Sequence, residues 1–354
     1  MAPALKTLVT ILSIALEVLS SPVNEHRGGK PRPPKYGHPP NKHTYWPGWD
    51  GITRMVVFGD SYTTTGFEVN GTQPSPANPL GNPPYPGYTS SNGPNWVDFL
   101  TTTCNATDLQ TLNLAYGGAV VDERLIAQYL PTVLSFRNQV EDEFLPLYAD
   151  GVQDTFTWQS GNTLFAAFFG INDVGNAYQA SNASDIFAAD FKSYASLMDT
   201  LYKSGARNFL FLNVPPVDRS PLTVAQSAAA QALEASTIDA WNANLTALAA
   251  NLSRAYADAT IFVFDTHALF SAVLDDPQVY PQTAAYVNTT DYCPWYENGT
   301  ETWYSTDARC GVSVDKYFWL NTLHPTFRVH NATAAEIAEQ LSAPEGGRSG
   351  WDRG

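Results

Sequence analysis

The sequence predicts a three-layer α/β/α sandwich with a five-stranded parallel sheet. Short apolar runs, bounded by Gly or polar residues, occur at residues 54–58, 111–115, 163–169, 208–214 and 260–264. Runs of this kind are typical of strands buried on both faces. Two of the intervening segments carry apolar stripes at helical spacing, namely Phe187, Phe191, Tyr194, Met198 and Leu201, and Ile238, Trp241, Leu245, Leu248 and Leu252. Strands that alternate with helices favour right-handed crossovers and a sheet covered on both sides.

Before the first strand, the chain has the features of an export signal. Residues 1–20 combine Lys6, an apolar stretch over residues 8–16 and a small-residue cleavage site near Ser20. Residues 21–51 are rich in Pro, Gly and basic side chains, which indicates a linker or propeptide. We therefore expect one domain over residues 52–342, a flexible tail over 343–354, and a secreted, extracellular protein.

The composition excludes several classes of partner. The chain of 354 residues has 34 acidic and 19 basic side chains, a formal net charge of −15. A body this acidic has no basic face for nucleic acid. The apolar stretch near the start is too short for a comfortable membrane span, and no later segment is long enough, so we expect no stable membrane association. The sequence shows no zinc-ligand spacing and no phosphate-cradling Gly loop, which predicts no metal and no cofactor. A monomer is expected.

Cysteines and sequons fit an oxidising compartment. Cys293 and Cys310 flank a loop rich in Gly, Thr and Tyr, and a disulfide between them is the natural expectation. Cys104 is then left over, and a buried free thiol is favoured over an intermolecular bond. Candidate glycosylation sites of the Asn-x-Ser/Thr type begin at Asn70, Asn105, Asn182, Asn244, Asn251, Asn288, Asn298 and Asn331.

Four short polar segments carry chemistry, and at least three of them follow predicted strands. They read Gly59-Asp60-Ser61-Tyr62, Asn113-Leu114-Ala115-Tyr116-Gly117-Gly118, Gly170-Ile171-Asn172-Asp173 and Asn321-Thr322-Leu323-His324-Pro325-Thr326. Singly, each segment is equally typical of a turn or a helix cap. Together they supply a hydroxyl nucleophile, a base to remove its proton, and donors for a developing oxyanion.

These four segments resemble the blocks of the GDSL, or SGNH, hydrolase superfamily, over nearly all of the chain from Arg54 to about Gln340. The resemblance implies Ser61 as nucleophile and His324 as base. It also implies an oxyanion hole made of the backbone N–H groups of Ser61 and Gly118 and the side chain of Asn172, with Asp60 and Asp173 in support. Within the superfamily the chain is most similar to secreted fungal members, including the acetylesterases of carbohydrate esterase family sixteen.

One position departs from the family pattern. Asn321 stands where the family has an Asp three residues before the histidine. In the serine protease template the same change costs about ten thousandfold in kcat, whereas papain-like enzymes work with Asn in the orienting role. Three possibilities remain open: Asn321 orients His324, an acid such as Asp315 or Asp307 does so, or activity is weak or lost.

The four segments therefore predict a serine esterase, and the resemblance implies that it removes acetyl groups from small or oligosaccharide ester substrates derived from plant cell walls. The alternatives are a lipase or lysophospholipase for longer acyl chains, and a weakened homologue that binds carbohydrate without turnover. The Pro- and Gly-rich insertion at residues 66–93 leaves from beside Ser61, and we expect it to shape the substrate site. Trp319, five residues before His324, is the best candidate for stacking on a sugar ring.

Overall fold

A five-stranded parallel sheet forms the centre of the protein, in the order β2-β1-β3-β4-β5. The computed structural model describes residues 46–149 and 156–343. The strands are β1 (Arg54–Gly59), β2 (Gln110–Asn113), β3 (Thr163–Phe168), β4 (Asn208–Leu212) and β5 (Thr260–Phe264). The predicted fold class is confirmed. The order in which successive strands are added reverses between β1 and β3. The crevice at such a switch point is where ligands bind in open α/β sheets.

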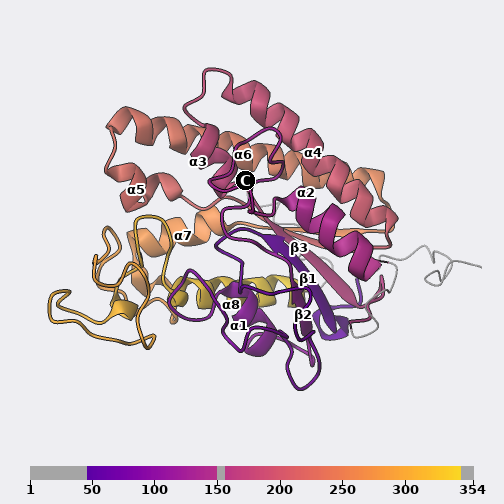
Figure 1. The fold of residues 1–354 in the computed structure, drawn as a ribbon, viewed down its shortest axis with the longest axis horizontal. Coiled ribbons are helices and arrows are strands. Elements are labelled where there is room, and N and C mark those ends of the chain that lie inside the picture. The colour runs from indigo at the N-terminus through magenta and orange to yellow at the C-terminus, as the bar shows by residue number, and fades with distance from the viewer. Residues whose placement is uncertain (1–45, 150–155, 344–354) are drawn as a thin grey trace, which may run out of the picture. The chain divides into compact units, whose positions relative to one another are not determined.

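Helices cover both faces of the sheet (Figure 1). One layer contains α1 (Trp96–Thr102), α7 (Thr266–Asp275) and α8 (Phe327–Ser342). The other contains α2 (Phe136–Asn138), which continues as a π-helix over Gln139–Ala149, followed by α3 (Ile171–Ala177), α4 (Ala183–Lys203), α5 (Pro221–Val224) and α6 (Ala228–Ala255). Short 3₁₀ turns occupy Trp49–Gly51, Val217–Arg219, Pro277–Val279 and Val314–Lys316.

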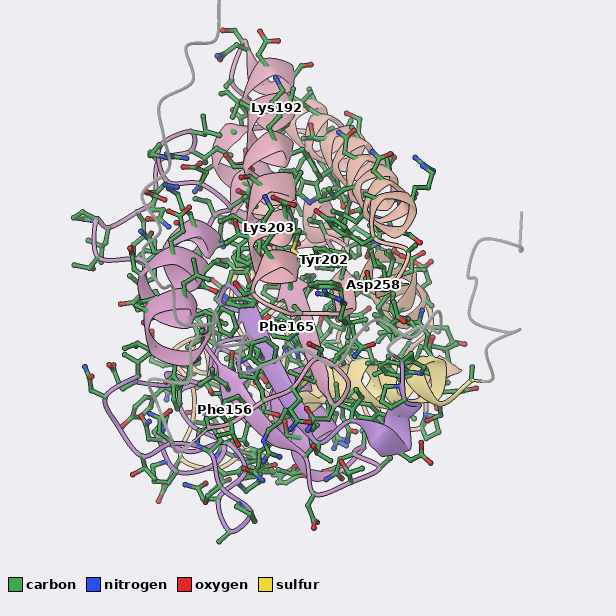
Figure 2. The ribbon with its side chains drawn as sticks, turned by 90° about the vertical axis from the view of Figure 1, so that its right-hand side faces the viewer. Phe156, Phe165, Lys192, Tyr202, Lys203 and Asp258 are labelled. Carbon is green, nitrogen blue, oxygen red and sulfur yellow. A yellow bond between two sulfur atoms is a disulfide. The ribbon has the colours of Figure 1, made fainter. Side chains whose placement is uncertain are left out.

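Aromatic side chains fill the space between the sheet and the layer of α2 and α4. The Phe136 ring lies 5.4 Å from that of Phe58 on β1, 4.6 Å from Phe169 after β3, and 5.3 Å from Tyr194 on α4. Tilted and edge-to-face aromatic pairs of this kind contribute about 0.5–1.5 kcal/mol each beyond their buried area. The end of α4 is fixed separately, because the Tyr202 hydroxyl donates to Asp258 at 2.6 Å (Figure 2).

The folded body begins earlier than the sequence predicted. Trp46 and Trp49 are buried, and the Trp46 ring packs edge-on against Phe262 of β5 at 4.7 Å. Trp49 Nε1 donates to the carbonyl oxygen of Cys104 at 3.2 Å. The prediction that residues 46–51 belong to an irregular linker is therefore wrong, because two indole rings gain burial by joining the core. The remainder of the predicted signal and linker, and nearly all of the predicted tail, lie outside the described residues.

Two long loop regions leave the sheet edge that carries the polar segments. One is the insertion over residues 66–93. The other runs from α7, the helix that follows β5, to α8, and it contains a disulfide between Cys293 and Cys310. Cys104 has a free, half-buried thiol. Among the described residues, no helix combines the length and apolarity that a membrane crossing needs.

Candidate active site

Ser61 lies in the tight turn that follows β1. Gly59, the last residue of the strand, forms two hydrogen bonds with the buried side chain of Gln139. The amide oxygen of Gln139 accepts from the Gly59 N–H at 3.0 Å, and its amide nitrogen donates to the Gly59 carbonyl at 2.9 Å. The carbonyl of Asp60 accepts from the N–H groups of Thr63 and Thr64 at 3.1 and 2.9 Å. The turn therefore holds the Ser61 side chain at the carboxyl end of the sheet.

His324 meets Ser61 across most of the chain. The two residues are 263 positions apart, yet Nε2 of His324 lies 2.8 Å from Oγ of Ser61. The loop carrying His324 is fixed by a hydrogen bond from the Leu320 N–H to the His324 carbonyl at 2.8 Å. Tyr62 also holds the loop of His324 in place. Its hydroxyl donates to the Leu323 carbonyl at 2.6 Å, and its ring lies 5.7 Å from the imidazole.

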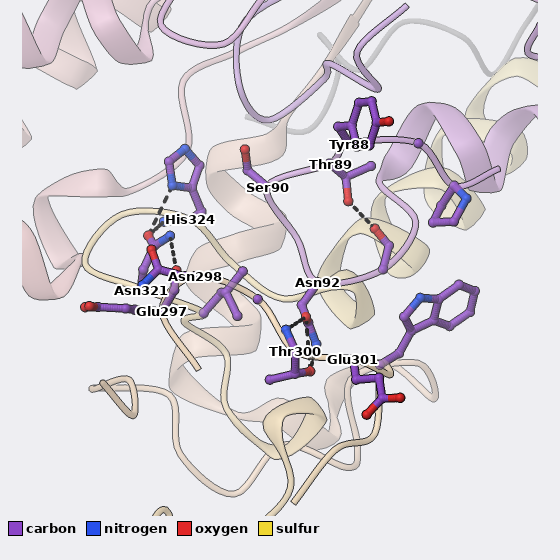
Figure 3. A pocket seen from close by; sticks show the side chains of 16 residues that line it. Tyr88, Thr89, Ser90, Asn92, Glu297, Asn298, Thr300, Glu301, Asn321 and His324 are labelled. Carbon is purple, nitrogen blue, oxygen red and sulfur yellow. Dashed lines mark hydrogen bonds between the residues drawn. The ribbon is translucent and has the colours of Figure 1, made fainter. Parts of the chain in front are cut away.

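Asn321 is the residue that contacts the other imidazole nitrogen. Its Oδ1 lies 3.1 Å from His324 Nδ1 and also accepts from the backbone N–H groups of Leu323 at 3.1 Å and His324 at 2.9 Å. Two backbone donors that converge on one atom identify it as the amide oxygen. The Nδ1 nitrogen must then carry the proton, which leaves Nε2 free to accept the proton of Ser61. Figure 3 shows Asn321 beside His324 at the edge of a pocket.

The two acids proposed from sequence as alternatives are engaged elsewhere. Asp315 forms an ion pair with Arg328 at 2.5 Å and accepts from the Ser313 hydroxyl at 2.5 Å. Asp307 pairs with Arg309 at 2.5 Å. Neither carboxylate contacts His324, so Asn321 alone among these three candidates reaches the ring.

Without a carboxylate partner, the imidazole is held neutral. Burial lowers the pKa of His324 to about 4. Desolvation penalises the charged imidazolium, and the neutral amide of Asn321 supplies no compensating negative charge. At neutral pH the ring is therefore in the form that can accept a proton.

The segment after β2 brings Gly118 next to the serine. The Tyr116 N–H donates to the Gly59 carbonyl at 3.0 Å, and a Cβ placed on Gly117 would lie 3.9 Å from that of Ser61. Gly118 has φ +85°, and a Cβ there would lie 2.2 Å from the ring of Tyr129, so only glycine fits. Within the described part of the chain, no group accepts a hydrogen bond from the N–H of Ser61 or of Gly118.

Asn172 is the second residue of α3, the helix that follows β3, and its side chain points toward the segment of Asp60 and Ser61. Its Nδ2 donates to the carbonyl of Ala119 at 2.9 Å and, over a longer 3.3 Å, to Oδ2 of Asp60. Asp60 is fully buried, and burial, with repulsion from Asp173, raises its pKa to about 8. Two N–H groups without an acceptor and one amide with a long hydrogen bond therefore belong to the segments next to Ser61, and they are candidates for the donors that an oxyanion needs.

Two clefts flank this centre. One, of about 550 Å³, is lined by His324 and Asn321 together with residues 86–93 and 297–303. The second, of about 450 Å³, is lined by residues 64–68 and 115–117, and Tyr88 borders both. The insertion at residues 66–93 therefore contributes to both walls. Trp319 does not: it is buried, and its Nε1 donates to the Thr289 carbonyl at 3.1 Å, so the expectation that it stacks on sugar is wrong.

The predicted glycosylation sites differ in exposure. Asn70, Asn182, Asn244, Asn251 and Asn298 have exposed side chains, whereas Asn105, Asn288 and Asn331 are half-buried. Asn298 also lines the cleft of His324. Over residues 46–149 and 156–343, no group of three or more His, Cys, Asp or Glu side chains has an arrangement that could hold a metal ion.

Sequence reasoning missed three supports of the site. Gln139 holds Gly59 from 80 positions away, Tyr129 lies against Gly118, and Tyr62, next to Ser61, reaches across the chain to the Leu323 carbonyl. Gln139 begins a π-helix, a form often found at functional sites, but no pattern in the sequence predicts that form. Tyr62, adjacent to Ser61, is the one whose position could have suggested a role.

The fold and these four segments define an ester hydrolase of the α/β/α sandwich class, and comparisons with known proteins agree. Residues 55–337 match the model of the family described as GDSL-like Lipase/Acylhydrolase. The chain is 39% identical to an acetylesterase of Thermothelomyces thermophilus over 291 residues, which covers 80% of this chain and 87% of the relative. It is 26% identical over 297 residues to a thermolabile hemolysin of Vibrio parahaemolyticus, with 82% and 64% covered.

Among solved structures, an acetylxylan esterase of Geobacillus stearothermophilus aligns with a TM-score of 0.46 and 14% identity, over 82% of this chain and 95% of that one. The chain belongs to the GDSL-like lipase/acylhydrolase family. It is a carboxylic ester hydrolase, as its relatedness to the Thermothelomyces acetylesterase also indicates.

Proposed function

We propose that the protein is a serine esterase that removes short acyl groups, above all acetyl, from sugar hydroxyls. The observation that carries the proposal is the array in which Ser61 Oγ lies 2.8 Å from His324 Nε2 while Asn321 Oδ1 lies 3.1 Å from Nδ1. A hydroxyl, a neutral imidazole of the correct tautomer and a group that orients the ring are the parts that nucleophilic acyl transfer needs.

In the proposed reaction, His324 Nε2 takes the proton of Ser61 as Oγ attacks the ester carbonyl. The carbonyl oxygen becomes an oxyanion held by the N–H groups of Ser61 and Gly118 and by Asn172, whose long bond to Asp60 is exchanged for one to the substrate. His324 then gives its proton to the alcohol, which leaves. Water repeats the sequence on the acyl-enzyme and releases the acid. One oxyanion donor typically accounts for about a hundredfold to a thousandfold in kcat.

The role of His324 as proton donor to the leaving alcohol indicates which cleft the alcohol would occupy. Because His324 must reach the departing oxygen, the alcohol occupies the cleft that His324 lines. Thr89, Ser90, Asn92 and Thr300 give that cleft hydroxyl and amide groups, and Trp303 adds an aromatic surface. A lining of this kind suits a polyhydroxylated leaving group, and the 39% identical acetylesterase supports a short acyl group.

A second candidate is hydrolysis of longer acyl chains. The cleft of about 450 Å³ on the Gly117 side includes the apolar side chains Phe67, Pro83 and Tyr116, and it could receive such a chain. The acyl group is the part of the substrate that remains near the oxyanion donors, so this cleft is in the appropriate place. The third possibility, sugar binding without turnover, conflicts with the intact Ser61–His324 contact.

The deciding experiment compares initial rates on p-nitrophenyl acetate, butyrate and octanoate for the wild type, Ser61→Ala and the control Ser236→Ala, which alters an exposed serine on α6. We expect acetate to be cleaved fastest, the Ser61 variant to be inactive and the control to match the wild type. A preference for octanoate would favour the lipase alternative. Absence of turnover by the wild type would refute the esterase proposal.

We also propose that the mature protein is secreted, glycosylated and monomeric. The signal-like residues 1–20, the exposed Asn side chains and the disulfide support this proposal. N-terminal sequencing of protein from a culture medium, its mass before and after endoglycosidase, and light scattering after gel filtration provide the tests. An intact N-terminus or a stable dimer would contradict the corresponding part.

A further inference from the structure

A second carboxyl lies against the aspartate that follows Asn172. Asp173 on α3 and Asp190 on α4 are both fully buried, and their carboxyl groups lie close enough to interact electrostatically. The family resemblance drew attention to Asp173 only. Asp190 comes from the middle of a long helix, where no part of the proposed reaction requires it.

The surroundings of the pair offer few hydrogen-bond donors. The Val121 N–H donates to Asp173 Oδ1 at 2.8 Å. Among the described residues, no N–H or O–H group makes a well-formed hydrogen bond to the other Asp173 oxygen or to either oxygen of Asp190. The backbone N–H of Asp122 and the hydroxyl of Tyr194 face the pair, and the Tyr194 hydroxyl makes no hydrogen bond.

Among the described residues, no buried cation faces the pair. Asp122, which acts on Asp190, is paired with Arg124, whose side chain is exposed, and the Asp122 carboxylate adds repulsion rather than relief. On the other side, the buried Asp60 faces Asp173. Two carboxyls in contact and out of water cannot both ionise without a cation, so one of them keeps a proton. Burial, with repulsion from Asp173, raises the pKa of Asp190, which makes Asp190 the group that keeps it.

The pair is connected to the two loops that carry the proposed oxyanion donors. Asp173 Oδ1 holds the N–H of Val121, and Asn172 Nδ2 holds the carbonyl of Ala119. These two hydrogen bonds tie the start of α3 to the segment that begins with Gly118. The distance between the Gly118 N–H and the Asn172 amide therefore depends on the orientation of the Asp173 carboxylate.

We infer that Asp190 is a positioning residue that stays protonated and donates its proton to Asp173, and that this hydrogen bond keeps the oxyanion hole assembled. The proton satisfies one buried oxygen of Asp173 and leaves the other directed at Val121. Loss of that proton at alkaline pH places two charges in contact, which turns Asp173 away and separates the two donors. The inference rests on the proposed function, because it takes Gly118 and Asn172 to be oxyanion donors.

The test compares Asp190→Asn, Asp190→Ala and the matched control Tyr194→Phe, with kcat and KM for p-nitrophenyl acetate measured from about pH 5 to about pH 10. An amide donates to Asp173 but has no proton to lose. We expect Asp190→Asn to stay within about threefold of wild-type kcat at pH 7 and to reduce the alkaline fall in kcat to the part caused by Asp60, whose pKa burial raises to about 8. Asp190→Ala should lower kcat by about tenfold or more with little change in KM, because the oxyanion donors act in the transition state. Tyr194→Phe should retain the wild-type profile.

Three results would overturn the inference: a wild-type alkaline limb in Asp190→Asn, full activity in Asp190→Ala, or an altered alkaline limb in Tyr194→Phe. If Asp190→Ala does not fold, the profile of Asp190→Asn still decides. Failure of the proposed function is a separate outcome, because it shows as activity in Ser61→Ala. A second readout is the urea midpoint against pH. An acid with a raised pKa costs stability increasingly as pH rises from about 4, so Asp190→Asn should flatten that slope.

Discussion

Replacing Asn321 with Asp tests whether the histidine is limited by its neutral partner. Asn321 Oδ1 already accepts the Nδ1–H of His324 at 3.1 Å, so the imidazole tautomer is correct and the substitution adds only charge. The amide nitrogen that is lost donates weakly, to the Glu297 carbonyl at 3.4 Å. The change is thus nearly isosteric, and its effect should be electrostatic.

The magnitude follows from Coulomb's law. Unit charges about 4 Å apart attract by about 4 kcal/mol at an effective dielectric constant of about 20. Because Asn321 borders an open cleft, we reduce this by about half for solvent screening. One pKa unit corresponds to about 1.4 kcal/mol, so the pKa of His324 should rise from about 4 by roughly one to two units. The same charge stabilises the imidazolium of the transition state, which should raise kcat at neutral pH by about tenfold to a hundredfold.

The assay is the dependence of kcat/KM for p-nitrophenyl acetate on pH, from about pH 3 to about pH 8. The acid limb reports the protonation of the free imidazole. Asn298→Asp, with all proteins produced in a host that does not N-glycosylate because Asn298 is a candidate glycosylation site, is the matched control, since it adds the same charge to the same cleft without contacting His324. An acid limb in Asn321→Asp that stays within about 0.3 unit of the wild type would refute the reasoning, as would an equal shift in the control.

Three further predictions follow from single contacts. Gly118→Ala should lower kcat at least tenfold, because a Cβ at φ +85° is strained and meets the Tyr129 ring, which should shift the Gly118 N–H; unchanged kcat would show that the reaction does not depend on this glycine. Burial raises the pKa values of Asp60 and Asp98 to about 8, so both stay protonated in the folded state while the unfolded chain ionises near pH 4. Stability should therefore fall as pH rises from about 4 to about 8, and urea titrations of Asp98→Asn should show a shallower fall. Trp303→Leu should raise KM for an acetylated oligosaccharide about fivefold or more and leave p-nitrophenyl acetate nearly unaffected; equal effects on both would contradict sugar contact.

The sheet could be predicted from sequence because its signal is local. Five buried apolar runs lie within one or two residues of the observed strands, and both apolar stripes lie on the observed helices α4 and α6. The N-terminal boundary could not be predicted in this way. Trp46 and Trp49 stand in a segment whose Pro, Gly and basic residues indicate a linker. Only the packing of Trp46 on β5 and the hydrogen bond of Trp49 to Cys104 reveal that they belong to the core.

The site was predictable only in part, because the contacts that build it join residues far apart in the sequence. Ser61 and His324 came from a resemblance in motif order, since nothing local connects residues 263 positions apart. The partner of the imidazole stayed undecided until the ion pairs of Asp307 and Asp315 were visible. Asp190 had no signal at all, because an aspartate on a helix is ordinarily a solvated residue, and its burial depends on packing against α3.

The proposed chemistry and the proposed recognition of substrate come from different parts of the chain. Ser61 and the proposed oxyanion donors follow the ends of strands, whereas the walls of the His324 cleft come from residues 86–93 and from residues 297–303 within the disulfide-closed loop. The Asn92 side chain joins the two walls by accepting from the Thr300 N–H at 2.7 Å. If these walls bind the alcohol as proposed, exchanging the two loops together should change the alcohol specificity and leave Ser61 and His324 in place.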